Sequence, residues 1–129
     1  MPRFGTRSKR RLKGVDTKLV NVLNEVVKHY DITVLEGLRS VERQKDLMAK
    51  GASKTMKSKH IDGKAVDIAP YPIPDWADTN QFVYMAGRVM QEADRLGVDV
   101  RWGGNWDRDN TVITDQKFQD LVHFEILDK

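Results

Sequence analysis

The chain has 129 residues, which is long enough for one domain with a hydrophobic core and too short for two. Its apolar fraction of 40% and charged fraction of 32% are ordinary for a globular protein and exclude global disorder. The net charge is a modest +3, and cysteine is absent, which excludes disulfides and thiolate metal sites. Any metal must therefore be held by His, Asp or Glu.

Positive charge is concentrated at the N-terminus, at Arg3, Arg7, Lys9, Arg10, Arg11 and Lys13. Such a run indicates either an anionic partner or a solvated end of the chain. No apolar run approaches the roughly 18 residues of a membrane-spanning helix. The basic segment also lacks the apolar stretch of a secretory signal. We therefore expect synthesis in a cytosol and no stable membrane insertion.

The first half of the chain predicts two helices and two strands. Apolar residues at helical spacing predict a helix over 17–30, and the β-branched segment 31–38 predicts a strand. Ser40 is the expected N-cap of a second helix over 41–50, which Gly51 ends. A polar loop over 51–63 then leads into a short strand over 64–69.

The second half adds one long helix and two strands. Three prolines predict extended, irregular chain over 70–76. Asp78 and Gln81 resemble a capping box at the start of an amphipathic helix that Gly97 ends. Strands are expected over 98–102 and 121–127, separated by a polar loop. The whole pattern predicts an α+β fold, a small and largely antiparallel sheet with helices packed on it.

Polar residues share one face of two predicted strands. Alternation places Asp67 in one strand, and His123 with Glu125 in the other, opposite the large apolar residues. A buried aspartate is costly without a partner. Together with His60, these strands offer two histidines and one carboxylate. Three protein ligands with a fourth position open is the pattern of a catalytic zinc site.

A catalytic zinc site also needs a general base. Asp120, three residues before His123, is one candidate, and Glu125 is the other. Each signal alone also fits a structural role: His60 as a capping residue, Asp67 as a partner of an arginine, His123 as a core histidine. The conjunction of the three favours the metal site.

Several segments resemble a known family. The segment SKHIDGKAVDIAP resembles the Ser-x-His-x-x-Gly-x-Ala-x-Asp signature of the VanY-like zinc peptidases, the D-alanyl-D-alanine carboxypeptidase superfamily. Within it, the chain resembles the phage L-alanyl-D-glutamate peptidase endolysins. FGTRSKRRLKGVDTKLV resembles their opening, EGLRSVERQ their second block, RWGGNWD their late loop and DLVHFEI their closing segment. The resemblance runs nearly end to end.

The resemblance implies a role for each candidate residue. His60, Asp67 and His123 would be the Zn²⁺ ligands, and Asp120 the catalytic base where more distant dipeptidases carry Glu. Glu125 would then be a supporting or rim carboxylate. The implied architecture is a single peptidase domain over 1–129, of the VanY-like and hedgehog-type zinc peptidase fold, with the basic segment 1–14 at its edge.

Arg39 matches the arginine that the family places near the scissile carbonyl, where a guanidinium would stabilise the developing oxyanion. A structural pairing of Arg39 with Glu36 or Glu42 is the alternative. Gln44 matches a position on the following helix that would support Arg39, and Ser58 would hydrogen-bond substrate or the loop.

The function implied by the resemblance is zinc-dependent hydrolysis of the L-alanyl-D-glutamate bond in bacterial peptidoglycan, for host lysis by a phage. The protein would be made in the host cytoplasm and reach the wall after a separate protein permeabilises the membrane. We expect a monomer that binds no nucleic acid. The alternatives are a D-alanyl-D-alanine carboxypeptidase or dipeptidase with the same zinc centre, and a non-catalytic, zinc-stabilised module that binds wall or nucleic acid.

Overall fold

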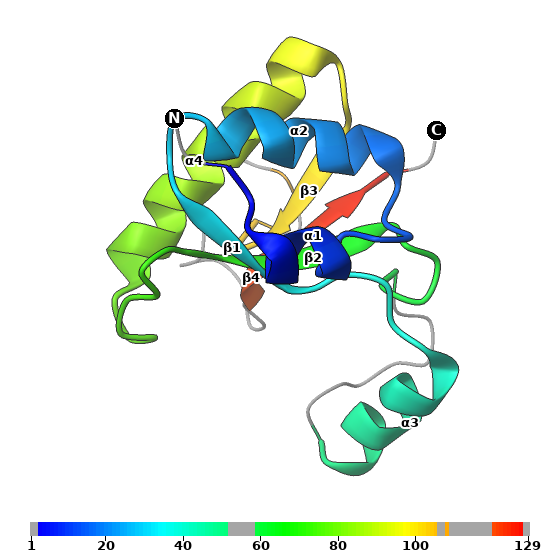
Figure 1. The fold of residues 1–129 in the computed structure, drawn as a ribbon. Helices are drawn as coiled ribbons and strands as arrows, with labels where there is room; N and C mark the ends of the chain where they lie inside the picture. Colours follow the sequence, from blue (N-terminus) through cyan, green and yellow to red (C-terminus); the bar gives the residue numbers. More distant parts are fainter. Residues whose placement is uncertain (1–2, 52–58, 106–107, 109–119, 128–129) are drawn as a thin grey trace.

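The computed structural model describes residues 3–51, 59–105, 108 and 120–127. Eight elements follow one another along the chain (Figure 1). They are α1 (Thr6–Arg11), α2 (Thr17–Val27), β1 (Ile32–Glu36), α3 (Val41–Ala49), β2 (Ala65–Pro70), α4 (Thr79–Leu96), β3 (Val100–Gly103) and β4 (Asp120–Ile126).

The four strands form one antiparallel sheet in the order β1-β2-β4-β3, so the last strand of the chain lies between β2 and β3. Helices α2 and α4 pack against each other over this sheet, and α4 contacts β2, β3 and β4 (Figure 1). The α+β fold class predicted from the sequence is confirmed.

Helices α2 and α4 supply the helical half of the core because their apolar residues recur every three or four positions. Asp16 caps α2 by accepting a hydrogen bond from the Lys18 amide (2.9 Å), and Gly97 ends α4 with φ of 70°. No described helix is long and apolar enough to cross a membrane. The buried residues of the two helices are Leu19, Val22, Leu23, Val26, Val27, Phe82, Met85, Ala86, Val89 and Ala93.

The two predicted N-caps have different outcomes. The Ser40 side chain accepts a hydrogen bond from the Arg43 amide (3.0 Å) and caps α3 as expected. At α4 the capping-box prediction is wrong, because the Asp78 side chain makes no cap hydrogen bond. Its Oδ2 instead accepts from the Gln81 side chain (3.0 Å), so Asp78 pairs with another side chain and does not cap a backbone amide of α4.

Helix α1 is absent from the sequence prediction, because six residues are too few to show a helical period. Its contacts with β1 stabilise it instead. The buried Ser8 hydroxyl accepts from the Val34 amide (3.0 Å), and the Arg11 guanidinium donates to the Val34 carbonyl (2.9 Å). These bonds use backbone groups of an edge strand and tie the basic N-terminal segment to the sheet.

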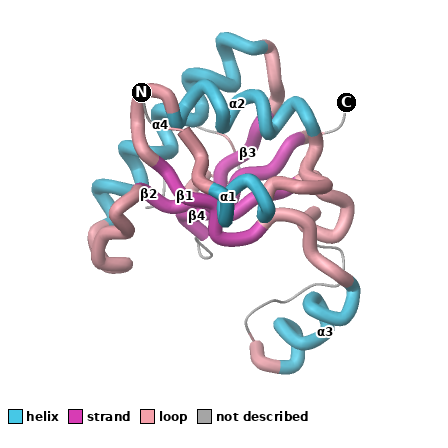
Figure 2. The backbone as a smooth tube through the Cα atoms, viewed as in Figure 1, coloured by secondary structure: helices cyan, strands magenta, loops and turns pink. Residues whose placement is uncertain are grey.

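Helix α3 projects away from the sheet and from the other helices, as the backbone tube shows clearly (Figure 2). Val41 and Met48 are exposed on it, and Gln44 is fully buried. The first turn of α3 therefore supplies one buried polar side chain close to the end of β1.

The core predicts a clear contrast between two leucines. Leu23→Ala removes a fully buried side chain and should lower the free energy of unfolding by about 2–5 kcal/mol. Leu96→Ala, at a leucine 39% exposed, should cost less than about 1 kcal/mol. Urea denaturation of both variants measures this, and equal losses would contradict the assignment of the core.

Candidate metal centre and active site

The register of the sheet brings the predicted ligands together. Asp67 in β2 lies directly opposite His123 in β4, and Glu36 in β1 lies opposite Asp67 on its other side. Residues in such cross-strand positions have Cβ atoms about 4.5–5.5 Å apart. His60 comes from the turn before β2, and its carbonyl accepts a hydrogen bond from the Arg39 amide (2.9 Å).

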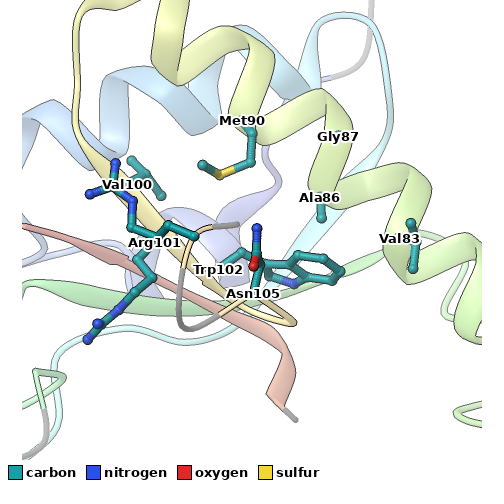
Figure 3. A pocket seen from close by; sticks show the side chains of 9 residues that line it. Val83, Ala86, Gly87, Met90, Val100, Arg101, Trp102 and Asn105 are labelled. Carbon is teal, nitrogen blue, oxygen red and sulfur yellow. The ribbon is translucent and has the colours of Figure 1, made fainter. Parts of the chain in front are cut away.

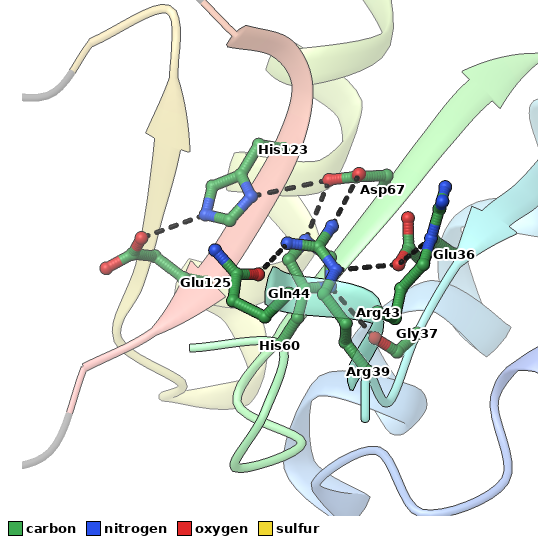
Figure 4. A network of polar contacts seen from close by, with 9 residues as sticks. All are labelled: Glu36, Gly37, Arg39, Arg43, Gln44, His60, Asp67, His123 and Glu125. Atoms are coloured by element: carbon green, nitrogen blue, oxygen red, sulfur yellow. Dashed lines mark hydrogen bonds and ion pairs between the residues drawn. The ribbon is translucent and has the colours of Figure 1, made fainter. Parts of the chain in front are cut away.

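One carboxylate oxygen contacts both histidines. Asp67 Oδ1 lies 3.1 Å from His60 Nε2 and 3.3 Å from His123 Nδ1 (Figure 4). His60 is 2% exposed and His123 is 8% exposed, so water has little access to either ring. The three residues predicted as metal ligands thus converge, with one ligand atom from each lying within 4.8 Å of the others.

Each imidazole is oriented through its other ring nitrogen. His60 Nδ1 donates to the Gly37 carbonyl (2.8 Å), and His123 Nε2 donates to Glu125 Oε1 (2.9 Å). The outer nitrogens therefore carry hydrogen, and the inner nitrogens face Asp67. Metal-binding histidines are held in this way, with the second nitrogen bonded to a carbonyl or a carboxylate.

The inner nitrogens and the carboxylate require a cation between them, because two lone pairs cannot face each other at hydrogen-bonding distance. In the metal-free protein that cation is a proton. Burial disfavours the charged His123, yet its hydrogen bonds with Asp67 and Glu125 outweigh burial and raise its pKa to about 9. Burial would likewise raise the pKa of Asp67, but hydrogen bonds with His123 and His60 hold it well below the usual range.

A metal ion can take the place of those protons. Two imidazoles and one carboxylate form a donor set that zinc accepts, and tetrahedral bonds of about 2.0–2.1 Å place donor atoms roughly 3.3 Å apart. The separations of 3.1 and 3.3 Å around Asp67 Oδ1 are close to this spacing. The side chains present therefore fit a zinc ion.

Arg39 lies beside this cluster and is held by two neighbours. Its Nε donates to Glu36 Oε1 (2.7 Å), and its Nη1 donates to Gln44 Oε1 (2.8 Å). Its Nη2 lies 4.0 Å from Asp67 Oδ2. The contact with Glu36 that the sequence left as an alternative is present, and so is the supporting contact from Gln44.

Asp120 is half-buried at the first position of β4, within range of the charges of the cluster. Burial and the negative charge of Asp67 raise the pKa of the Asp120 carboxyl, while the two histidines and Arg39 oppose that rise. A half-buried carboxyl with a perturbed pKa, beside a potential metal site, is typical of a catalytic acid or base.

A glycine allows β3 to approach Asp120. The pairing of β3 with β4 is regular through Trp102 and Phe124, then shifts so that Gly103 lies opposite Asp120. A Cβ atom on Gly103 would lie only 2.0 Å from the Asp120 carbonyl oxygen. The Trp102 indole donates to the Leu121 carbonyl (2.9 Å) and holds the same stretch of β4.

Both oxygens of Glu125 are engaged. Oε1 accepts from His123, and Oε2 accepts from Arg101 Nη2 (2.8 Å) with Lys59 Nζ at 3.8 Å. Burial would raise the pKa of Glu125, but the hydrogen bonds with His123 and Arg101 outweigh burial and lower it. Glu125 is therefore an ionised carboxylate that holds the outer nitrogen of His123.

Sequence reasoning missed three of these neighbours, namely the Gly37 carbonyl, Arg101 and Lys59. The alternation of β3 was a signal for Arg101, since it places this arginine opposite the apolar residues of its strand. A backbone carbonyl leaves no such signal. Ser58 lies outside the described residues, so its predicted role stays a prediction.

Several cavities open along the sheet, and two of them differ in the residues that line them. One of 240 Å³ opens beside Asp120 and is also lined by Trp76 and Phe82. Another of 310 Å³ lies between α4 and β3, with Met90 and Trp102 in its wall (Figure 3). Among the described residues, the lining of this second cavity contains no imidazole and no carboxylate. Of these two cavities, the one beside Asp120 is therefore the one lined by a candidate catalytic residue.

The raised pKa of His123 predicts how the metal-free protein responds to pH. His123 binds its proton more tightly in the folded chain than in the unfolded chain, so protonation of His123 stabilises the fold. This stabilisation is complete below about pH 6.5 and is lost as the pH rises toward the folded pKa of about 9. After removal of metal by a chelator, the urea midpoint should therefore fall across this interval. His123→Gln should flatten the slope, and His29→Gln, at an exposed histidine, should leave it unchanged. A midpoint that rises across the interval would refute the proton arrangement.

Comparison with known proteins agrees with this geometry. Residues 1–127 match the sequence model of the family described as phage L-alanyl-D-glutamate peptidase. The L-alanyl-D-glutamate peptidase of Escherichia phage T5 is 33% identical over 112 residues, covering 81% of this chain and 82% of that protein. The crystal structure of the Serratia marcescens L-Ala D-Glu endopeptidase ChiX matches with a TM-score of 0.81 and 32% identity, covering 97% of this chain and 90% of that one. The chain belongs to the phage L-alanyl-D-glutamate peptidase family.

Proposed function

We propose that this protein is a zinc-dependent endopeptidase that hydrolyses the L-alanyl-D-glutamate bond of bacterial peptidoglycan. The observation that carries the proposal is the half-buried Asp67 carboxylate between the inner nitrogens of two buried histidines whose outer nitrogens are already bonded. The family description and the names of both relatives support the choice of bond.

His60, Asp67 and His123 would hold the zinc ion. When bound, zinc lowers the pKa of a water molecule toward ~7 and polarises a carbonyl group. The protein orients both imidazoles before any metal arrives, through Gly37 on one side and Glu125 on the other. Such outer contacts raise the basicity of the ligands and hold the rings in place.

Asp120 is the general base. The engagement of both Glu125 oxygens supports this choice, because Oε1 accepts from His123 Nε2 and Oε2 accepts from Arg101. The Asp120 carboxylate takes a proton from the attacking water and returns it to the nitrogen of D-glutamate as the peptide bond breaks. In the metal-free protein, burial and the negative charge of Asp67 raise the pKa of this carboxyl.

Arg39 stabilises the negative charge that develops on the carbonyl oxygen. Glu36 and Gln44 hold the guanidinium through Nε and Nη1, which leaves Nη2 directed toward Asp67. A donor held in place in this way needs no reorganisation when the charge appears. The pairing with Glu36 is thus compatible with a catalytic role for Arg39.

Membership of a phage peptidase family supports a biological setting in host lysis. The protein acts as a monomer on peptidoglycan. It reaches the wall from the host cytoplasm after a separate protein permeabilises the membrane.

Separate variants test the base and the ligands. Asp120→Asn should keep its zinc and lose at least about 10²-fold in activity, because the proton acceptor is removed. His123→Ala should lose both zinc and activity. Asp94→Asn, the same change at an exposed position of α4, is the matched control. Wall digestion is followed by mass spectrometry of the new termini, with zinc content measured on each protein. Release of free D-alanine would contradict the proposed scissile bond. Full activity of Asp120→Asn would contradict the role of Asp120 as the base.

Arg39→Lys tests oxyanion stabilisation. The lysine keeps the charge but cannot make the two-sided contact with Glu36 and Gln44. We expect kcat to fall by about 10²-fold to 10³-fold, with zinc content unchanged. Arg95→Lys, at an arginine in surface ion pairs, is the control and should leave kcat unaltered. A change in KM alone would assign Arg39 to substrate binding.

A further inference from the structure

A basic groove adjoins the candidate active site. It has a volume of 690 Å³ and lies where α1, the end of β1 and the first turn of α3 meet. Arg10, Arg11 and Lys13 line it from one side and Arg43 from the other. The carboxylate in its wall, Glu36, is already bonded to Arg39. Four cations thus surround a space whose only acidic wall residue among those described is neutralised.

We propose that this groove binds the acidic part of the stem peptide on the carboxyl side of the scissile bond, beginning with the free carboxylate of D-glutamate. The inference rests on the proposed function, and it gives the substrate a direction across the site.

The groove and the active site share a wall. The Gly37 carbonyl, in the groove wall, accepts from His60 Nδ1 (2.8 Å), so one imidazole ring separates it from Asp67. Glu36 is separated from Asp67 by the guanidinium of Arg39. A peptide extends by about 3.3–3.6 Å per residue. D-glutamate is the first residue beyond the scissile bond, and the proposal places its free carboxylate at this shared wall, on the Glu36 and Gly37 side of the cluster.

The charge of the groove matches the chemistry of the substrate. D-glutamate has two carboxyl groups, and if one forms the bond to the next residue, the other remains as an anion. Arginine guanidinium groups bind carboxylates through charge-assisted hydrogen bonds. The exposed Leu38 side chain and the half-buried Leu35, also in the lining, offer apolar contact to the peptide stem.

The test compares two substrates that differ by one charge. Both are N-acetylmuramyl-L-alanyl-D-glutamyl peptides, one with the free carboxylate and one with the corresponding amide. The zinc-loaded full chain is assayed as wild type and as the Arg10→Ala/Lys13→Ala double variant. Arg7→Ala/Lys9→Ala is the matched control, because it removes two exposed cations from the same N-terminal segment outside the groove lining. Kd for both peptides is also measured on Asp120→Asn, with and without the groove substitutions, which reports binding independently of turnover.

We expect the wild type to have a lower KM for the acid than for the amide. Loss of each exposed ion pair should raise KM for the acid about threefold, and the double variant should raise it roughly tenfold with kcat unchanged. KM for the amide should not move, and the Kd values should follow the same pattern. Added salt should weaken the preference for the acid.

Three results would overturn the proposal. Equal KM and Kd for the acid and the amide would show that the groove does not distinguish the free carboxylate of D-glutamate from its amide. Equal weakening of both substrates by the double variant would indicate a structural role. Reduced adsorption to intact walls without any change toward the soluble peptides would assign the groove to an anionic wall polymer. If the wild type cleaves neither peptide, the proposed function fails, and the Kd comparison still decides the groove.

Discussion

The candidate site depends on the shared contact of Asp67 Oδ1 with two buried imidazoles. Burying a carboxylate or an imidazolium alone is costly, and burying them together is tolerable only when each polar atom has a partner. Here the partners come from three adjacent strands and one turn. Every other polar contact of the site extends outward from this cluster.

Two chains of alternating charge lead away from Asp67. One runs through His123 and Glu125 to Arg101. The other runs through Arg39 to Glu36, with Arg43 at 4.0 Å from the same carboxylate oxygen. In both chains each carboxylate lies between positive groups, so repulsion between the acidic residues is limited. The second chain ends at the solvent, where the basic groove begins.

The sequence predicted the parts of the molecule that repeat with a regular period. The apolar faces of α2 and α4 and the alternation of β2 and β4 are strong local signals, and they gave the fold class and the side-chain faces of Asp67 and His123. That His60 would join them followed only from the family resemblance and the conjunction of residue types. Local rules failed at Asp78, where a side-chain pair replaced the cap, and at α1, which exists because Ser8 and Arg11 bond to β1. Contacts between distant segments, such as Arg101 with Glu125, carry no local signature.

The direct pairing of Asp67 with His123 makes the candidate site sensitive to the alignment of β4 with its neighbouring strands. Side chains in a sheet alternate with a period of two, so a slip of β4 by a single residue would turn His123 toward the opposite face from Asp67. The same slip would carry Asp120 away from Gly103. A chain with a misaligned sheet would thus lose a candidate ligand and the candidate base at once, and it would be inert instead of partly active. Activity of this member of a phage peptidase family would then be an all-or-none report of correct strand alignment.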